Sequence, residues 1–138
     1  MAEFEMQLPD DVLKDVDFLY SNADSIFGQM TRAGAKVVQK MIRANVPDSF
    51  RSSNIMDCLK VTRTYKTPTD DGINTKVAFY GYFTNSHGVK TPAPLVCNVF
   101  EYGSTKFGKQ PFMRRSFNKS EIEQAMLKEQ KKATGGIL

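Results

Sequence analysis

The sequence is poor in the side chains from which metal centres and disulfide frameworks are built. Its 138 residues include one histidine, two cysteines and no tryptophan. Two cysteines are too few for a disulfide scaffold, and together with one histidine they give no zinc-ligand spacing. We therefore expect no metal site, and we interpret Cys58 and Cys97 as reduced, partly buried thiols of a protein that folds in a cytoplasm.

Long apolar runs and phosphate-binding loops are also missing. No segment approaches the roughly 18 consecutive apolar residues that span a membrane. The acidic N-terminal stretch lacks the basic and apolar regions of a signal peptide. Neither a Gly-x-Gly-x-x-Gly motif nor a Walker loop is present. The sequence thus predicts no membrane segment, no cofactor and no small-molecule substrate.

The side chains that could support catalysis have simpler structural explanations. His87 lies in a polar loop beside a glycine, which is typical of a solvated residue. Cys97 lies in an apolar run, whereas a nucleophilic cysteine needs a thiol of lowered pKa. The paired carboxylates at positions 10–11 and 70–71 fit a helix start and a turn. We therefore predict that the protein is not an enzyme.

Length and composition indicate one ordinary globular domain. The chain is 41% hydrophobic and 25% charged, and its length allows one core. We assign residues 1–132 to a single domain and residues 133–138, which contain two adjacent glycines, to a flexible tail.

Charge is segregated along the chain. Residues 1–31 carry a net charge of −6, whereas residues 32–138 carry +10. An acidic head and a basic body would be complementary across a subunit boundary, or would pair within one monomer. A basic body is also typical of proteins that bind nucleic acid.

The longest periodic pattern predicts a helix that begins near Asp10 and ends before Pro47. Its apolar residues recur every three or four positions, as on one face of a helix. They are Val12, Val16, Leu19, Ala23, Ile26, Met30, Ala33, Val37 and Met41. A break near residues 21–24 would divide it into two helices, with Asp24 capping the second. We interpret the stripe as a face packed on a sheet; a coiled-coil seam is the alternative.

The remaining patterns predict a small antiparallel sheet and a C-terminal helix, which gives an α+β fold. Alternating residues predict a short strand at 3–8 and a hairpin of strands 57–66 and 73–84, whose apolar face lies on the long helix. Residues 47–54 and 84–94 are expected to be loops. Residues 95–100 fit either a strand or a short helix that ends at Gly103. A capping box beginning at Ser120 starts the final helix, which runs to about Lys132.

Residues 94–117 combine features of a protein–protein contact. An apolar run ends at Glu101, Tyr102 and Gly103, a polar loop with Lys106 and Lys109 follows, and Pro111 then starts a helical turn. We expect Glu101 to accept from loop amides or to pair with an arginine of the same or the next subunit. The candidate assembly residues are Glu101, Tyr102, Gly103, Lys106, Lys109, Pro111, Phe112, Arg114 and Arg115.

A basic nucleic-acid-binding module is the alternative function. The basic side chains of the 94–117 segment and Lys119 alternate with Phe107, Phe112 and Phe117. Bases stack on aromatic rings beside cations in proteins that bind single strands. Phenylalanines that flank a helix start are, however, more often part of a core.

The order of motifs resembles a known family. A long helix ends in Ala-Asn-Val-Pro at residues 44–47, a hairpin follows, and Glu-Tyr-Gly-Ser at 101–104 precedes Gln-Pro-Phe-Met-Arg at 110–114. This resembles the tail-completion (head–tail joining, minor tail component) proteins of long-tailed bacteriophages, over roughly residues 20–132. Many members have a glycine in the turn after the proline, which residues 48–51 lack.

The resemblance implies a structural virion protein without catalysis. Its α+β domain would assemble on itself into a ring, usually sixfold, at the top of the tail. Its partners would be the major tail tube protein and the head-connector or stopper protein, with DNA only as passing cargo. The protein would lie in the virion neck, and in the host cytoplasm during assembly. On this interpretation, Glu101→Ala or Arg114→Glu impairs assembly more than folding.

Overall fold

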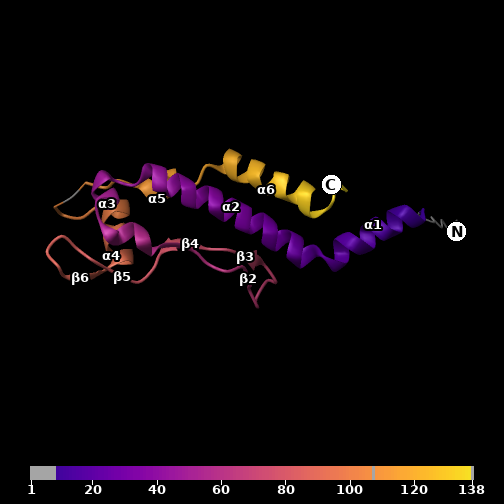
Figure 1. Ribbon diagram of the computed structural model, residues 1–138, viewed down its shortest axis with the longest axis horizontal. Coiled ribbons are helices and arrows are strands. Elements are labelled where there is room, and N and C mark those ends of the chain that lie inside the picture. The colour runs from indigo at the N-terminus through magenta and orange to yellow at the C-terminus, as the bar shows by residue number, and fades with distance from the viewer. Residues whose placement is uncertain (1–8, 107, 138) are drawn as a thin grey trace, which may run out of the picture.

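The computed structural model describes residues 9–106 and 108–137. Figure 1 shows an elongated molecule in which the long helix α2 lies between helix α6 on one side and the small sheets on the other. Short helices and strands gather at one end of α2, and α1 extends beyond the other end. The α+β class is confirmed, whereas the strand predicted at residues 3–8 lies outside the described residues.

The long N-terminal helix is divided in two, as one of the sequence interpretations allows. Helix α1 spans Asp10–Ser21 and α2 spans Ala23–Asn45. The break is at Asn22, whose side-chain amide donates to the Phe18 carbonyl at 2.8 Å. Capping by Asp24 is wrong, because Asn22 occupies the N-cap position and makes no side-chain cap bond. Asp24 instead pairs with Lys66 of the hairpin at 3.4 Å.

The face of α2 that is buried differs from the predicted stripe. Its buried residues are Ile26, Gly34, Ala35, Val38 and Ile42, and only Ile26 belongs to that stripe. The stripe residues Val37 and Met41 are half-buried and line a hollow between α2 and α6. Helix α2 packs against α6 on one side and against the hairpin strands on the other. Its buried face therefore lies between these two contacts.

The predicted hairpin forms, but each of its two strands is interrupted and shorter than expected. Strands β1 (Leu59–Val61) and β2 (Tyr65–Lys66) pair antiparallel with β4 (Val77–Phe79) and β3 (Ile73–Asn74), respectively. Leu59 lies opposite Phe79 in this register. A threonine contact joins the hairpin to α2, since the Thr31 and Thr75 hydroxyls are 3.0 Å apart.

Residues after Phe79 form a separate sheet. The backbone turns at Gly81, which has a φ of 82° that L-residues rarely adopt. Strand β5 (Tyr82–Thr84) then pairs with β6 (Lys90–Pro92). The prediction of a loop over residues 84–94 is therefore wrong, because a tight turn at 85–89 returns the chain to pair with β5.

The expected loop at residues 47–54 is also largely helical. Helix α3 spans Asp48–Arg51, and a 3₁₀ helix, η1, spans Asn54–Cys58. Phe50 and Ile55 are 2% and 1% exposed. Burial of these two apolar side chains fixes a segment whose polar composition alone indicates a loop.

The C-terminal half is helical. Helix α4 spans Ala93–Tyr102, α5 spans Phe112–Arg115 and α6 spans Lys119–Ala133. Residues 95–100, for which the sequence allowed either a strand or a helix, are therefore helical. Asn118, rather than Ser120, caps α6 by accepting from the Glu121 amide at 3.3 Å. Flexibility of residues 133–138 stays a prediction, although Thr134 is buried.

The core is an aromatic cluster at the end of the molecule that holds α3, α4 and α5. The Phe50 ring contacts the rings of Phe79, Phe100 and Phe112 edge-on, at centroid distances of 5.9, 4.9 and 5.1 Å. Each such pair contributes about 0.5–1.5 kcal/mol beyond the burial of its area. The cluster therefore joins four segments that are distant in the sequence.

We predict that Gly34→Leu destabilises the protein because α2 and α6 approach closely there. A Cβ atom at Gly34 would lie 3.2 Å from Ile122 Cγ2 and 3.3 Å from Met126 Sδ. Overpacking of this kind costs about 1–3 kcal/mol, measured as the free energy of unfolding in urea. Lys36→Leu, at an exposed position of the same helix, is the control and should change stability by less than about 0.5 kcal/mol. Equal stabilities of the two variants would contradict the close packing.

Candidate assembly surface

The predicted contact segment folds as α4, a loop and α5, and one carboxylate holds these parts together. Glu101 Oε1 accepts from the Met113 amide at 2.5 Å, and Oε2 accepts from Arg114 Nε at 3.2 Å. Arg114 Nη2 also donates to the Glu101 carbonyl at 3.0 Å. Hydrogen bonds to a charged group are stronger than neutral ones. The last turn of α4 is therefore fixed against the start of α5.

Two of the predicted assembly residues belong to the interior. Glu101 is 6% exposed and Phe112 is 3% exposed, so neither can contact a partner from the folded chain. The pair of Glu101 with Arg114 forms within one chain, which decides between the two arrangements that the sequence left open. Both residues position the segment, and this changes the expectation that Glu101→Ala acts mainly on assembly.

Tyr102 and Phe117 are two exposed aromatic side chains of this region, and Leu95 of α4 is exposed as well. The two aromatic residues are 71% and 57% exposed. Both line a hollow between α4 and α5, with Pro94 and Asn98 on the α4 side. The Arg114 guanidinium lies over the Tyr102 ring at 5.4 Å from its centroid. We call Pro94, Asn98, Tyr102, Arg114 and Phe117 the α4–α5 surface.

The chemistry of the α4–α5 surface is that of a protein contact. Tyrosine, phenylalanine and arginine are enriched at protein interfaces, and tyrosine and arginine at their energetic centres. A cation over an aromatic ring restrains both side chains before a partner arrives. Phe117 was grouped with the core residues in the sequence interpretation, and its exposure corrects that assignment.

The other predicted residues surround this surface. Gly103 ends α4 with a φ of 76°, and its amide donates to the Val99 carbonyl at 2.8 Å. Lys106, Lys109 and Arg115 are exposed, and Pro111 immediately precedes α5. The loop thus extends a positive potential beside the α4–α5 surface.

The interleaved aromatics of the nucleic-acid alternative are not equivalent. Phe112 is buried in the aromatic cluster and is not available for stacking. Phe117 is exposed, and Phe107 lies outside the described residues. The structure therefore does not present the alternating cations and rings that the sequence pattern indicates.

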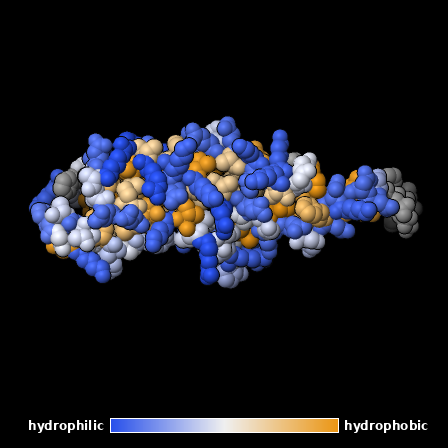
Figure 2. Space-filling view, viewed as in Figure 1, coloured by the Kyte–Doolittle hydropathy of each residue, from blue (hydrophilic) through white to orange (hydrophobic). Residues whose placement is uncertain are grey.

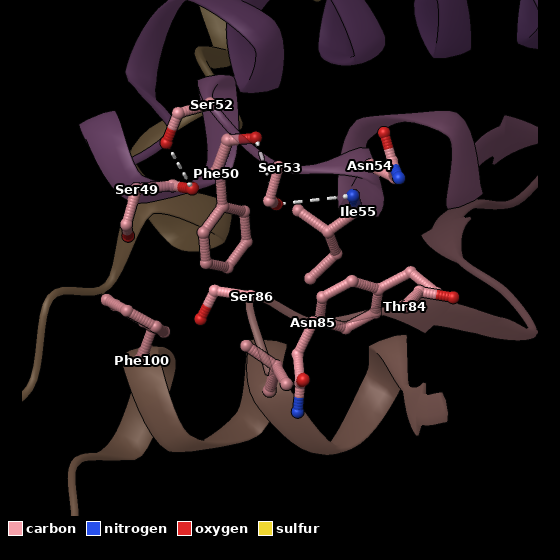
Figure 3. A pocket seen from close by; sticks show the side chains of 12 residues that line it. Ser49, Phe50, Ser52, Ser53, Asn54, Ile55, Thr84, Asn85, Ser86 and Phe100 are labelled. Carbon is pink, nitrogen blue, oxygen red and sulfur yellow. Dashed lines mark hydrogen bonds between the residues drawn. The ribbon is translucent and has the colours of Figure 1, made fainter. Parts of the chain in front are cut away.

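A larger hollow, which the sequence patterns do not indicate, lies on the opposite side of α4. Figure 3 shows Phe50 and Ile55 from α3 and η1 facing Phe100 of α4 across it. Its other lining groups are mostly serine, asparagine and threonine side chains, and none of the lining residues is charged. The three serines within residues 49–53 are the sequence feature that could have indicated this hollow. Uncharged hydroxyl and amide groups can hydrogen-bond a neutral partner, but they supply no acid or base near neutral pH.

The thiol of Cys97 is unreactive for a physical reason. Burial raises its pKa from 9.0 to about 12, and the charge of Glu101 and the Cys58 thiol add to the rise. Both cysteines are free and buried, as predicted. His87 is exposed, and its backbone amide donates to Asn85 Oδ1 at 2.9 Å.

The described part of the chain also holds no other recognised centre. Over residues 9–106 and 108–137, no group of three or more histidine, cysteine or acidic residues could hold a metal ion. No helix in these ranges is both long and apolar enough to cross a membrane.

We predict that Glu101→Ala destabilises the monomer. It removes the carboxylate that accepts from the partly buried Met113 amide, and a buried donor left unsatisfied costs about 1–3 kcal/mol. Urea unfolding would measure the loss, and Tyr102→Ala on the same helix turn should cost less than about 0.5 kcal/mol because Tyr102 is exposed. Similar losses for the two variants would mean that the Glu101 contacts do not hold α4 to α5.

We also predict a pH dependence that originates at Cys97. Between pH 9 and about 12 the folded thiol keeps its proton while the unfolded thiol loses it. Stability therefore falls as the pH rises through this window, by up to about 1.4 kcal/mol per pH unit. Unfolding of the wild type and Cys97→Ala at pH 8, 9 and 10 should show a steeper decline for the wild type. Parallel declines would contradict the raised pKa.

Comparison with known proteins adds no relative. No family model, no curated protein and no solved structure matches the chain. The resemblance to phage tail-completion proteins thus depends on the residues at 44–47, 101–104 and 110–114. A functional conclusion must be argued from the geometry of the surface and from that resemblance.

Proposed function

We propose that this protein is a structural component of a phage neck, which assembles into a ring that completes the tail and joins it to the head connector. The observation that carries the proposal is the α4–α5 surface, where Tyr102 and Phe117 stand exposed beside Arg114. The motifs that resemble the tail-completion family, at residues 101–104 and 110–114, are the segments that build this surface.

Rigidity supports an assembly role for this surface. The buried Glu101 carboxylate fixes Arg114 from one side, and the Phe112 ring anchors α5 in the core. A surface held in advance loses less conformational entropy when it binds. The Tyr102 ring therefore stands at a defined position at the end of α4.

Charge supports contact between copies. The described acidic residues of the head lie on α1 and at the start of α2, and α1 projects beyond the end of the basic body (Figure 1). In a ring, one end of each copy meets a different part of its neighbour. Opposite charges would then face each other and favour one orientation of assembly.

The test is the double variant Tyr102→Ala/Phe117→Ala. It should weaken ring formation on purified tail tubes about tenfold or more, because aromatic residues at the centre of an interface carry much of the binding energy. Negative-stain microscopy of tube ends and light scattering would measure assembly, and circular dichroism would show that the fold is kept.

Tyr82→Ala is the matched control. Tyr82 is 61% exposed and has Lys90 over its ring at 5.0 Å, but it lies on β5 and does not line the hollow of the α4–α5 surface. The Tyr82→Ala variant should bind tube ends as well as the wild type does. A wild-type protein that remains a monomer and never decorates tube ends would contradict the proposal. Salt-sensitive binding to DNA instead would favour the nucleic-acid alternative.

A further inference from the structure

Helix α1 exposes an apolar face that no other segment within residues 9–106 and 108–137 covers. None of its residues is buried, and Val12, Leu13 and Val16 are 38%, 44% and 50% exposed. Tyr20, at the end of the helix, is 86% exposed. Figure 1 shows α1 extending past the end of the body, and Figure 2 shows apolar patches among the polar atoms of this projecting part.

Acidic side chains border this apolar face. On a helical projection of 100° per residue, Val12, Val16 and Leu19 share one face, with Asp15 on one flank and Asp17 on the other. Of the residues that the structure describes, no aspartate of α1 takes part in an ion pair, whereas Asp24 of α2 does. An amphipathic helix with unpaired carboxylates along its border fits an apolar groove with basic edges.

The body of the molecule has such a groove between α2 and α6. Half-buried Val37 and Met41 from α2 and Ala125 from α6 give it an apolar lining. Lys40 and Lys128 border it, one from each helix, and Glu121 also lines it. Residues 121–128 and 12–19 each extend over about 10 Å of helix, so the two apolar surfaces match in length.

The chain's own α1 cannot occupy this groove. Val37 lies about 22 Å along α2 from the break at Asn22, at 1.5 Å per residue. If α1 folded back at Asn22, Val12 would reach only about 15 Å along α2. The apolar face of α1 would therefore stop short of the groove, and an α1 that fills it must come from another copy.

We propose that α1 is an exchange arm that docks in the α2–α6 groove of a second copy of this chain. The apolar face of Val12, Val16 and Leu19 covers Val37 and Met41 of the neighbour. The aspartates on its flanks approach Lys40 and Lys128. The inference rests on the proposed ring, in which each copy would give its arm to one neighbour and receive an arm from the other.

Cross-linking between two differently tagged variants tests this contact. Val16→Cys places a thiol on the arm, and Gln124→Cys places one at the groove. A short bismaleimide is added to an equal mixture of the two, free in solution and with tail tubes present. The native cysteines are buried and should not react. We expect a mixed dimer to dominate, whereas Val16→Cys mixed with Thr69→Cys, on the exposed turn of the hairpin, should give at least fivefold less.

Charge reversal supplies a second measurement. Asp15→Lys/Asp17→Lys should reduce the mixed dimer about tenfold, and Lys40→Glu/Lys128→Glu in the groove partner should restore it. Asp57→Lys/Asp70→Lys, at exposed positions of the body, is the control and should leave the yield unchanged. Restoration identifies the arm and the groove as partners, since each reversal alone would only disturb charge.

The outcomes separate this inference from the proposed function. Rings on tube ends without the mixed dimer would contradict the docking of α1 in the groove, but they would support the proposed ring. Dominant dimers between two Val16→Cys chains would also contradict this docking, because the arm would then pair with another arm. The absence of both rings and mixed dimers would overturn the arm and the ring together.

Discussion

The packing of the Phe50 ring is the contact on which the rest of the structure depends. Phe50 comes from a short helix of polar composition, yet it is 2% exposed and meets rings from β4, α4 and α5. The edge-on contacts bring together segments that lie up to about 60 residues apart. Loop closure over such distances costs entropy, which the burial of several aromatic rings offsets. Both hollows beside α4 exist because this cluster fixes the helix between them.

The Glu101 carboxylate adds direction to that packing. Apolar contacts alone would hold α5 near α4 without choosing its rotation, because the hydrophobic effect is not directional. Hydrogen bonds from the Met113 amide and Arg114 to one buried carboxylate select a single arrangement. Arg114 is then held over the Tyr102 ring, and the exposed surface acquires its shape from a buried group. The proposed assembly surface is thus a consequence of interior chemistry.

At the other end of the molecule, apolar side chains remain exposed to solvent. Helix α1 has a strong amphipathic pattern, but none of the other described residues covers its apolar face. The α2–α6 groove has the complementary features and is too far from the break at Asn22 for its own arm to reach. An exposed apolar helix at one end of the molecule is the feature from which we propose that burial is completed by a second copy.

The sequence by itself determined the elements with strong local signals. The spacing of apolar residues predicted α2, β-branched and aromatic alternation predicted the hairpin, and Gly103 marked the end of α4. That residues 94–117 form a contact region stays a prediction. The sequence pattern failed at residues 47–54 and 84–94, where polar composition indicates loops but burial of Phe50 and pairing with β5 impose regular structure. The sequence pattern also misplaced the buried face of α2. This helix packs against both α6 and the hairpin, and it buries the side that lies between them.

Only the tertiary structure decided which residues of the contact region face outward. The sequence does not distinguish the exposure of Glu101, Phe112 and Phe117. In the structure the first two are buried and the third is exposed. The same is true of the apolar stripe, in which Val12 and Val16 of α1 are exposed, Ile26 of α2 is buried, and Val37 and Met41 line the α2–α6 groove. Local sequence sets the periodicity of a helix, but the exposure of each face depends on which distant segments pack against it.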